Sequence, residues 1–90
     1  MVKTELTGKF EQMLEELLLS DPKLSTKIDK LINLFKKNSN DTRLKNHKLT
    51  GKMVGQFAFS INEDIRIVYE IIGKNTVRFL AIGPHEKVYP

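Results

Sequence analysis

The sequence has no cysteine and no apolar segment long enough to cross a bilayer. Without cysteine the chain forms neither a disulfide nor a thiolate zinc site, so packing must supply its stability, which suits the reducing cytoplasm. The longest apolar runs are residues 17–19 and 65–72, the second interrupted by Arg66 and Glu70, and no signal-peptide pattern follows Met1. We therefore expect a cytoplasmic protein that does not enter a membrane.

Several common catalytic motifs are also missing. The chain contains no glycine-rich loop that would cradle a phosphate, no nucleophile elbow and no paired-carboxylate motif. Its two histidines, His47 and His85, are far apart in the sequence, whereas zinc sites usually draw on a fuller set of closely spaced ligands. We expect neither a metal ion nor a cofactor, so any chemistry must come from ordinary side chains.

Positive charge is concentrated in one segment. The 90 residues carry a net charge of +4 and fit one domain, residues 1–90, that buries roughly 60% of its unfolded surface. Residues 36–52 contain six basic side chains, Lys45, Lys48 and Lys52 among them, against the single acid Asp41. Such a segment attracts polyanions and favours nucleic acid or an acidic protein as partner, although a solvated helix end and loop explains the charge equally well.

The first half of the chain predicts a strand followed by a helical hairpin. Residues 2–6 alternate between apolar and polar, as a short strand does, and Thr7 is placed to cap a helix that ends near Ser20. Asp21 and Pro22 repeat the start signal for a second helix. Each helix has one apolar stripe that needs a cover. The two stripes comprise Phe10, Met13, Leu14, Leu17 and Leu18, and Leu24, Ile28, Leu31, Ile32 and Phe35.

The second half predicts three strands that supply this cover. After a polar loop over residues 38–46 and a turn near Gly51, apolar residues alternate through residues 56–61, 65–71 and 77–81. The alternation assigns Tyr69, Ile71 and Ala81 to the helix-covered face and Ile82 to the other face. That other, partly open face also carries Gln56, Ser60, Asp64, Arg66 and Arg78. The expected fold is α+β, with an N-terminal strand and helical hairpin packed on a C-terminal antiparallel β-meander.

Arg66 is the most informative single residue. Its neighbours in the strand are hydrophobic, and it lies on the face away from the helices, where packing does not require a long cation. A guanidinium can bind phosphate oxygens through two N–H groups and stabilise the charge that develops in phosphoryl transfer. A cross-strand ion pair with Glu70 or Asp64 is the alternative. Arg78 shares the open face and joins the lysines as a candidate RNA contact.

The histidines can supply acid–base chemistry. His85 lies in the loop that leaves the last strand, His47 lies in the basic loop before the sheet, and a histidine with a pKa of about 6.5 exchanges protons near neutral pH. One can draw the proton from a 2′-hydroxyl and the other can protonate the leaving 5′-oxygen. Asp64 can orient a histidine or act as the base, and Tyr89 can stack on a nucleobase or lend its hydroxyl. Each of these roles has an alternative. The two histidines can be ordinary surface residues, Asp64 can merely end a turn, and Tyr89 can pack the chain end on the core.

Three segments of the second half resemble a known family. "NHKLTGKMVG" (residues 46–55) is similar to a His-x-Leu-x-Gly segment, "DIRIVYEI" (64–71) to an Asp-bearing strand that ends in Tyr, and "IGPHEKVY" (82–89) to a Gly-x-His segment followed by an aromatic. These segments occur in the YafQ-like branch of the RelE/ParE superfamily of toxins. The resemblance covers about residues 44–89, and the first forty residues match only in their order of strand, helix and helix. Ser60 stands where the branch often has another histidine.

The resemblance implies a toxin of a type II toxin–antitoxin pair. It implies a ribosome-dependent mRNA endoribonuclease, or mRNA interferase, that uses the 2′-hydroxyl as the internal nucleophile and needs no metal. His47, Asp64, His85 and Tyr89 match the active-site pattern of the branch, and Arg66 matches the strand arginine of RelE. The implied partners are a cognate antitoxin, the ribosome and mRNA, and the toxin is expected to be a monomer when free and part of a hetero-oligomer with its antitoxin.

Two other functions remain open. A ParE-like member would inhibit DNA gyrase by binding, without RNA chemistry, although such a binder has no need for titratable groups around an arginine. A noncatalytic basic module would hold RNA or an acidic protein through Lys45, Lys48 and Lys52. Substitution of His85 separates both alternatives from the nuclease, because only the nuclease depends on an imidazole.

Overall fold

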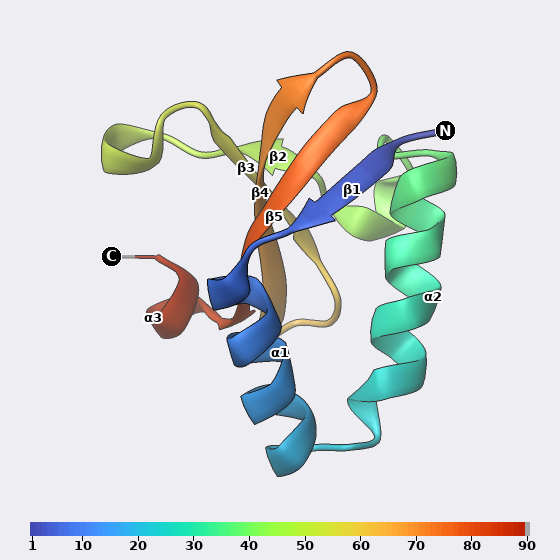
Figure 1. The fold of residues 1–90 in the computed structure, drawn as a ribbon, viewed down its shortest axis with the longest axis vertical. Coiled ribbons are helices and arrows are strands. Elements are labelled where there is room, and N and C mark those ends of the chain that lie inside the picture. The colour runs from blue at the N-terminus through green and yellow to red at the C-terminus, as the bar shows by residue number, and fades with distance from the viewer. Residues whose placement is uncertain (90) are drawn as a thin grey trace.

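The structure, a computed structural model, describes residues 1–89 and is built on one five-stranded sheet. The strand order is β1-β5-β4-β3-β2, in which β1 runs parallel to β5 and all other neighbours are antiparallel (Figure 1). The strands are β1 (Lys3–Leu6), β2 (His47–Lys48), β3 (Gln56–Ser60), β4 (Ile65–Gly73) and β5 (Thr76–Pro84). The predicted N-terminal strand and meander are confirmed, and β2 is an additional edge strand.

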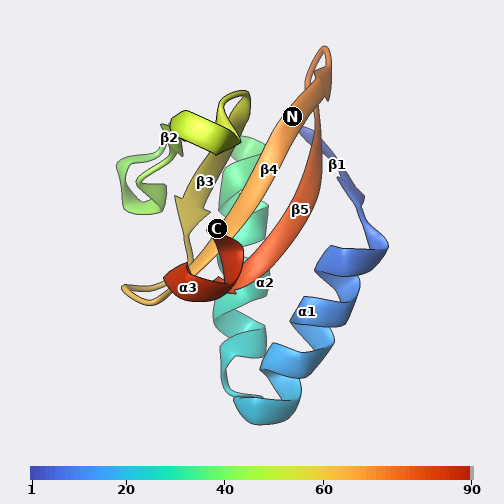
Figure 2. The same ribbon diagram turned by 90° about the vertical axis from the view of Figure 1, so that its left-hand side faces the viewer.

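Helices lie on both sides of this sheet. The long helices α1 (Gly8–Ser20) and α2 (Leu24–Lys37) form the predicted hairpin and cover one face, while the 3₁₀ turn η2 (Gly51–Met53) and the short helix α3 (His85–Val88) lie over the other (Figures 1 and 2). A second 3₁₀ turn, η1 (Thr42–Leu44), precedes β2. The α+β fold is therefore as predicted. Within residues 1–89, no helix is long and apolar enough to cross a membrane.

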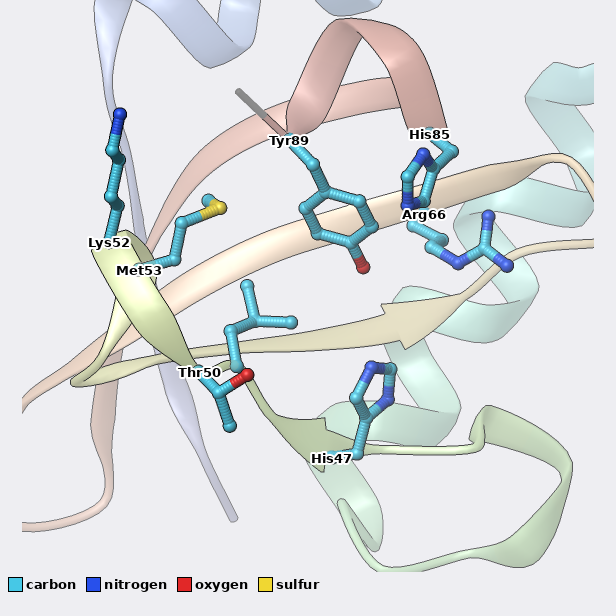
Figure 3. A pocket seen from close by; sticks show the side chains of 8 residues that line it. His47, Thr50, Lys52, Met53, Arg66, His85 and Tyr89 are labelled. Atoms are coloured by element: carbon cyan, nitrogen blue, oxygen red, sulfur yellow. The ribbon is translucent and has the colours of Figure 1, made fainter.

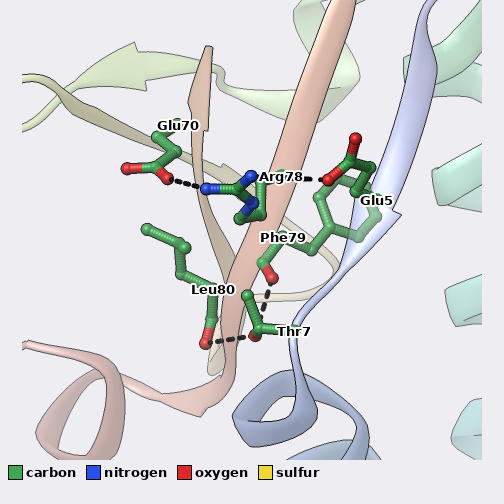
Figure 4. Close-up of polar contacts among 6 residues, drawn as sticks. All are labelled: Glu5, Thr7, Glu70, Arg78, Phe79 and Leu80. Carbon is green, nitrogen blue, oxygen red and sulfur yellow. Dashed lines mark hydrogen bonds and ion pairs between the residues drawn. The ribbon is translucent and has the colours of Figure 1, made fainter. Parts of the chain in front are cut away.

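Thr7 caps α1, as the sequence predicts. Its side-chain oxygen accepts a hydrogen bond from the Phe10 N–H at 3.1 Å, which satisfies one of the free donors in the first helical turn. The same hydroxyl donates to the carbonyl oxygen of Phe79 in β5 at 3.0 Å (Figure 4). One side chain thus starts the helix and attaches it to the sheet.

The start of α2 differs from the prediction. Asp21 is the C-terminal cap residue of α1, and the second helix begins at Leu24, whose preceding residue Lys23 makes no capping bond through its side chain. Backbone hydrogen bonds from Leu24 to Asp21 and from Ser25 to Pro22 close a tight turn between the helices instead. Asp21 was expected to cap α2 because Asp-Pro is a common start signal, but here this pair forms the connection.

The helix-covered face holds a core of aromatic rings. Phe35 of α2 stacks on Phe59 with ring centroids 4.4 Å apart and meets Tyr69 edge-on at 4.9 Å, and Phe10 of α1 lies 5.3 Å from Phe79. All five side chains are at most 3% exposed. The prediction that Tyr69 belongs to the core is confirmed, and its hydroxyl donates to the Asn46 side-chain oxygen at 2.7 Å.

A β-bulge changes which residues of β5 face the helices. Val68 pairs with Ala81 whereas Tyr69 pairs with Phe79, so Leu80 has no partner in the register. The assignment of Ala81 to the helix-covered core and of Ile82 to the open face was therefore wrong: Ile82 joins the aromatic core, and Ala81 packs with Ala58, Val68 and Val88 on the opposite face. Ile71 was also expected in the core but is 59% exposed.

Candidate active site

A pocket of about 530 Å³ lies on the sheet face opposite α2. Its lining combines side chains from the loop around β2, from β4 and from the C-terminal segment (Figure 3). Four of the five residues predicted to be catalytic meet there, together with one predicted RNA contact. The lining residues are His47, Leu49, Thr50, Lys52, Met53, Arg66, His85 and Tyr89.

His47 occupies the first position of β2 and not an irregular loop as predicted. It pairs with Ala58 of β3, and its ring points from this edge strand into the pocket (Figure 3). The ring nitrogen Nδ1 lies 2.8 Å from the carbonyl oxygen of Lys45, whose left-handed backbone (φ 51°) directs the chain around the turn. Because a carbonyl only accepts hydrogen bonds, Nδ1 must carry the proton, so in neutral His47 the nitrogen free to accept a proton is Nε2.

His85 and Tyr89 come from the single turn of α3. His85 is the first residue of this helix, directly after Pro84, and the Tyr89 backbone N–H donates to the His85 carbonyl at 3.0 Å. This spacing of four residues places the two rings on the same side, where they meet edge-on with centroids 4.5 Å apart. The tyrosine ring therefore limits where the imidazole can turn.

Arg66 carries its charge into the pocket without a neutralising partner. Among residues 1–89 no carboxylate forms an ion pair with it, and the only hydrogen bond of its side chain there runs from Nη1 to the Asp64 carbonyl oxygen at 3.4 Å. Glu70, the partner considered in the sequence, instead accepts from Arg78. The strand order places β4, which carries Arg66, between β2 with His47 and β5 with the following α3.

The Tyr89 hydroxyl is buried and chemically neutral. The oxygen has no hydrogen-bond partner among the described residues, and the ring packs against the small residues of the open face, Ala58, Val68 and Ala81. Burial raises the pKa of the hydroxyl above its usual value of 10.0, and the charge of Arg66 offsets part of this rise. Tyr89 therefore keeps its proton near neutral pH.

Asp64 does not line this pocket. It belongs to the turn before β4, where its N–H donates to the Asn62 side-chain oxygen at 2.8 Å, and it borders a separate hollow together with Glu16 and Glu86. Its link to the pocket is the backbone carbonyl that accepts from Arg66. A catalytic role of the Asp64 carboxylate stays a prediction, but the carboxylate lies outside the lining.

Arg78 is also remote from the pocket. Its guanidinium donates to Glu70 at 3.1 Å and to Glu5 of β1 at 3.5 Å, so two carboxylates offset its charge (Figure 4). Of the predicted lysine contacts, Lys52 lines the pocket, whereas Lys48 of β2 and Lys45 before this strand are exposed. RNA contact by Arg78, Lys45 or Lys48 stays a prediction.

Sequence reasoning missed three lining residues, Leu49, Thr50 and Met53. They reach the pocket because the chain folds back after β2: Gly51 and Gly55 adopt positive φ values of 67° and 91°, and η2 forms between them. The two glycines were the available signal, since they bracket a loop that returns to the sheet. In the part of the chain that the structure describes, no group of three or more acidic or histidine side chains is placed to hold a metal ion.

Comparisons with known proteins agree with this architecture. A copper-bound mutant toxin from Helicobacter pylori is 26% identical and superposes with a TM-score of 0.77 over 99% of this chain and 100% of the other. A YoeB/ParE toxin from Agrobacterium tumefaciens is 24% identical (TM-score 0.77; 93% and 99% covered), and the YafQ toxin in the Escherichia coli DinJ-YafQ toxin-antitoxin complex is 22% identical (TM-score 0.79; 99% and 98% covered). No curated protein sequence matches the chain.

These structural similarities show the fold, whereas a comparison of sequences shows the family. The sequence profile of the family described as "Bacterial toxin of type II toxin-antitoxin system, YafQ" matches residues 2–90. That match includes the first forty residues, for which the motifs gave only an order of elements. The chain belongs to the YafQ family of type II toxin–antitoxin toxins.

Proposed function

We propose that this toxin is an endoribonuclease that cuts mRNA on the ribosome by metal-free acid–base chemistry. The observation that carries the proposal is the pocket: it gathers two histidines, a lysine and an arginine, and among residues 1–89 no carboxylate lines it. A phosphodiester bears negative charge that grows in the transition state, and an unpaired guanidinium in a partly enclosed site stabilises that charge.

The reaction needs one group that removes a proton and one that supplies it. In this proposal Nε2 of His47 takes the proton of the 2′-hydroxyl while the 2′-oxygen bonds to the adjacent phosphorus. The bond between phosphorus and the 5′-oxygen breaks, and protonated His85 gives its proton to that oxygen. The products are a 2′,3′-cyclic phosphate and a 5′-hydroxyl, and each histidine contributes roughly 10²–10⁴-fold.

The other residues in or near the pocket bind the negative charge of the RNA and its nucleobase. Arg66 binds the non-bridging oxygens of the phosphate, and the ring of neutral Tyr89 stacks on a nucleobase. Lys52 adds long-range attraction for the message, and Lys45 and Lys48 extend that basic surface beside β2. Asp64 acts indirectly, because its carbonyl holds the guanidinium of Arg66.

The positive charge of the pocket also indicates which partners bind it. The E. coli relative forms a complex with DinJ, and we propose that a cognate antitoxin likewise covers this pocket, so that the toxin is monomeric when free and hetero-oligomeric when inhibited. Ribosome dependence would place the action in the cytoplasm. A pocket of unpaired cations suits an antitoxin segment that carries carboxylates, which would occupy the position of the scissile phosphate.

The test maps the 5′ ends of messages during a short induced pulse. Codon-phased cuts should appear with the wild type and disappear with His85→Ala. Glu86→Ala is the matched control, because it changes the next residue of α3, whose side chain borders a different hollow; its cuts should persist. Undiminished growth arrest by His85→Ala with gyrase trapped on DNA would instead support a gyrase poison, and loss of effect only on neutralising Lys45, Lys48 and Lys52 would support a noncatalytic RNA binder.

A further inference from the structure

A second hollow of about 320 Å³ adjoins the proposed catalytic pocket. The two share Met53 and Tyr89, so those side chains separate two compartments of one groove. The second compartment, which we call the lysine hollow, lies where the start of α1, the first residue of β3 and α3 approach one another. It is lined by Lys9, Met53, Gln56, Val68, Ala81, Lys87, Val88 and Tyr89.

The charge of the lysine hollow suits a phosphate. Lys9 and Lys87 are both exposed, neither forms an ion pair within residues 1–89, and no carboxylate is among the lining residues. The hollow under α1 on the other side of α3 shares Lys87 but differs in its charge, since three carboxylates, those of Glu16, Asp64 and Glu86, also border it. A polyanion that leaves the catalytic pocket is therefore drawn toward Lys9 and Lys87 and repelled from the acidic hollow.

The walls of the lysine hollow suit a nucleobase. Its floor is made of Val68 and Ala81, which are 1% and 5% exposed, and the ring of Tyr89 and the thioether of Met53 form the divide. Aromatic and polarizable groups provide a stacking surface for a base. Gln56 is half-buried at the edge and carries an amide that both donates and accepts hydrogen bonds, as the edge of a base requires.

We propose that the lysine hollow is a second nucleotide subsite, which binds the nucleotide next to the one at the scissile linkage. Lys9 and Lys87 hold the phosphate of that nucleotide, and its base lies against Tyr89 and Met53 near Gln56. The volume of about 320 Å³ falls at the lower end of the range of small-ligand pockets, roughly 300–1,000 Å³. The inference rests on the proposed function, because it presumes an RNA strand in the catalytic pocket.

The test compares 2′-O-methyl oligonucleotides of random sequence that are two and four nucleotides long, which cannot be cleaved because every 2′-oxygen is blocked. Binding to the whole toxin is measured by NMR titration. The tetranucleotide should bind the wild type about tenfold more tightly than the dinucleotide, and only the tetranucleotide should shift the signals of Lys9, Gln56 and Lys87. Equal affinity for both lengths in the wild type would overturn the proposal.

Charge-neutral variants locate the effect. In the double variant Lys9→Gln/Lys87→Gln the tenfold ratio should fall to within about twofold of unity, and the slope of log K against log salt for the tetranucleotide should decrease by about 0.7, as expected for the loss of one phosphate contact. The matched control Lys27→Gln/Lys30→Gln removes the same charge from the exposed side of α2 and should retain the ratio. A ratio that survives in the Lys9/Lys87 variant contradicts the subsite.

Failure of the subsite and failure of the nuclease give different results. If His85→Ala stops cleavage while the Lys9/Lys87 variant keeps the length-dependent gain, the nuclease stands and the subsite is wrong. If the Lys9/Lys87 variant loses the gain while His85→Ala still cuts message, the subsite stands as an RNA contact and the assignment of the acid–base chemistry is wrong.

Discussion

The two faces of the sheet are built from different side chains. The face under α1 and α2 is filled by the rings of Phe10, Phe35, Phe59, Phe79 and Tyr69. The opposite face has a floor of small residues, Ala58, Val68 and Ala81, paired side by side across β3, β4 and β5. Large rings bury area on one face, whereas small side chains leave room on the other for the pocket and for the loop and helix that border it.

The two faces therefore serve different properties: the aromatic face supplies stability, and the small-residue face carries the groups proposed for chemistry. The cation of Arg66 and the buried hydroxyl of Tyr89 both lie on the small-residue face. Within residues 1–89 the cation has no ion-pair partner and the hydroxyl has no hydrogen-bond partner, so neither stabilises the fold strongly there. The aromatic face contains mainly apolar packing, and the Tyr69 hydroxyl within it is satisfied by Asn46. Substitutions on the two faces should therefore affect different measurements.

The largest effect is expected from Phe35→Ala. Phe35 is 1% exposed and contacts the rings of Phe59, Tyr69 and Phe79, so its removal should lower the free energy of unfolding by about 3–5 kcal/mol. Val68→Ala, on the other face, removes two carbons and should lower it by about 1.5 kcal/mol. Urea unfolding measures both changes, and losses of equal size would contradict the division between the faces.

The next effect is on activity. Arg66→Ala should reduce message cleavage by about 10²–10³-fold, equivalent to about 2.7–4 kcal/mol of transition-state stabilisation, and should change the unfolding free energy by no more than about 0.5 kcal/mol. Both quantities are measured on the same preparation, cleavage with ribosomes and message and stability by urea unfolding.

Arg78→Ala is the matched control for Arg66→Ala. Arg78 is another strand arginine, but Glu5 and Glu70 already bind its guanidinium outside the pocket. Its substitution should lower cleavage less than tenfold. Equal losses from the two arginines would mean that general positive charge, and not the position of Arg66 in the pocket, drives the reaction.

Local signals in the sequence predicted the elements well. The cap at Thr7 and the alternation around Tyr69 each depend on residues within a few positions, so the pattern contains what is needed to place them. The bulge at Leu80 depends on the register between β4 and β5, and β2 depends on its pairing with β3, His47 with Ala58 and Lys48 with Phe57. Both are contacts between distant segments, which the periodicity of a single strand does not encode.

The sequence predicted the types of residue that form the site better than it predicted which residues line the pocket. Four residues that the sequence predicts from their chemistry line the pocket: His47, Arg66, His85 and Tyr89. Asp64 has the same parity as Arg66 yet faces another hollow, because β4 begins at Ile65 and the Asn62 side chain holds Asp64 in the preceding turn. Alternation applies only within a strand, so it fails one residue before the strand begins.

The smallest effects compare one tyrosine from each face. At neutral pH Tyr69→Phe should cost about 1 kcal/mol, because it removes the hydrogen bond to Asn46 and leaves that amide oxygen unpaired. Tyr89→Phe should change stability by only a few tenths of a kcal/mol, since the buried Tyr89 oxygen has no partner to lose among residues 1–89. Thermal unfolding at pH 7 checks both, and a larger loss from Tyr89→Phe would reverse the comparison.

Alkaline pH sharpens the contrast between these tyrosines. Burial raises the pKa of both hydroxyls above 10.0, an effect opposed at Tyr69 by the hydrogen bond to Asn46 and at Tyr89 by the charge of Arg66. Above pH 10 the unfolded chain therefore loses protons that the folded chain retains, so the stabilisation is complete below pH 10 and falls as the pH rises toward the folded pKa values. Each Tyr→Phe variant should show a shallower decline between pH 10 and 11 than the wild type. Arg66 carries a full charge and also lies in the pocket. Arg66→Ala should therefore steepen the decline in stability that is due to Tyr89 and leave the part due to Tyr69 unchanged. The Tyr89→Phe/Arg66→Ala double variant isolates the Tyr69 part.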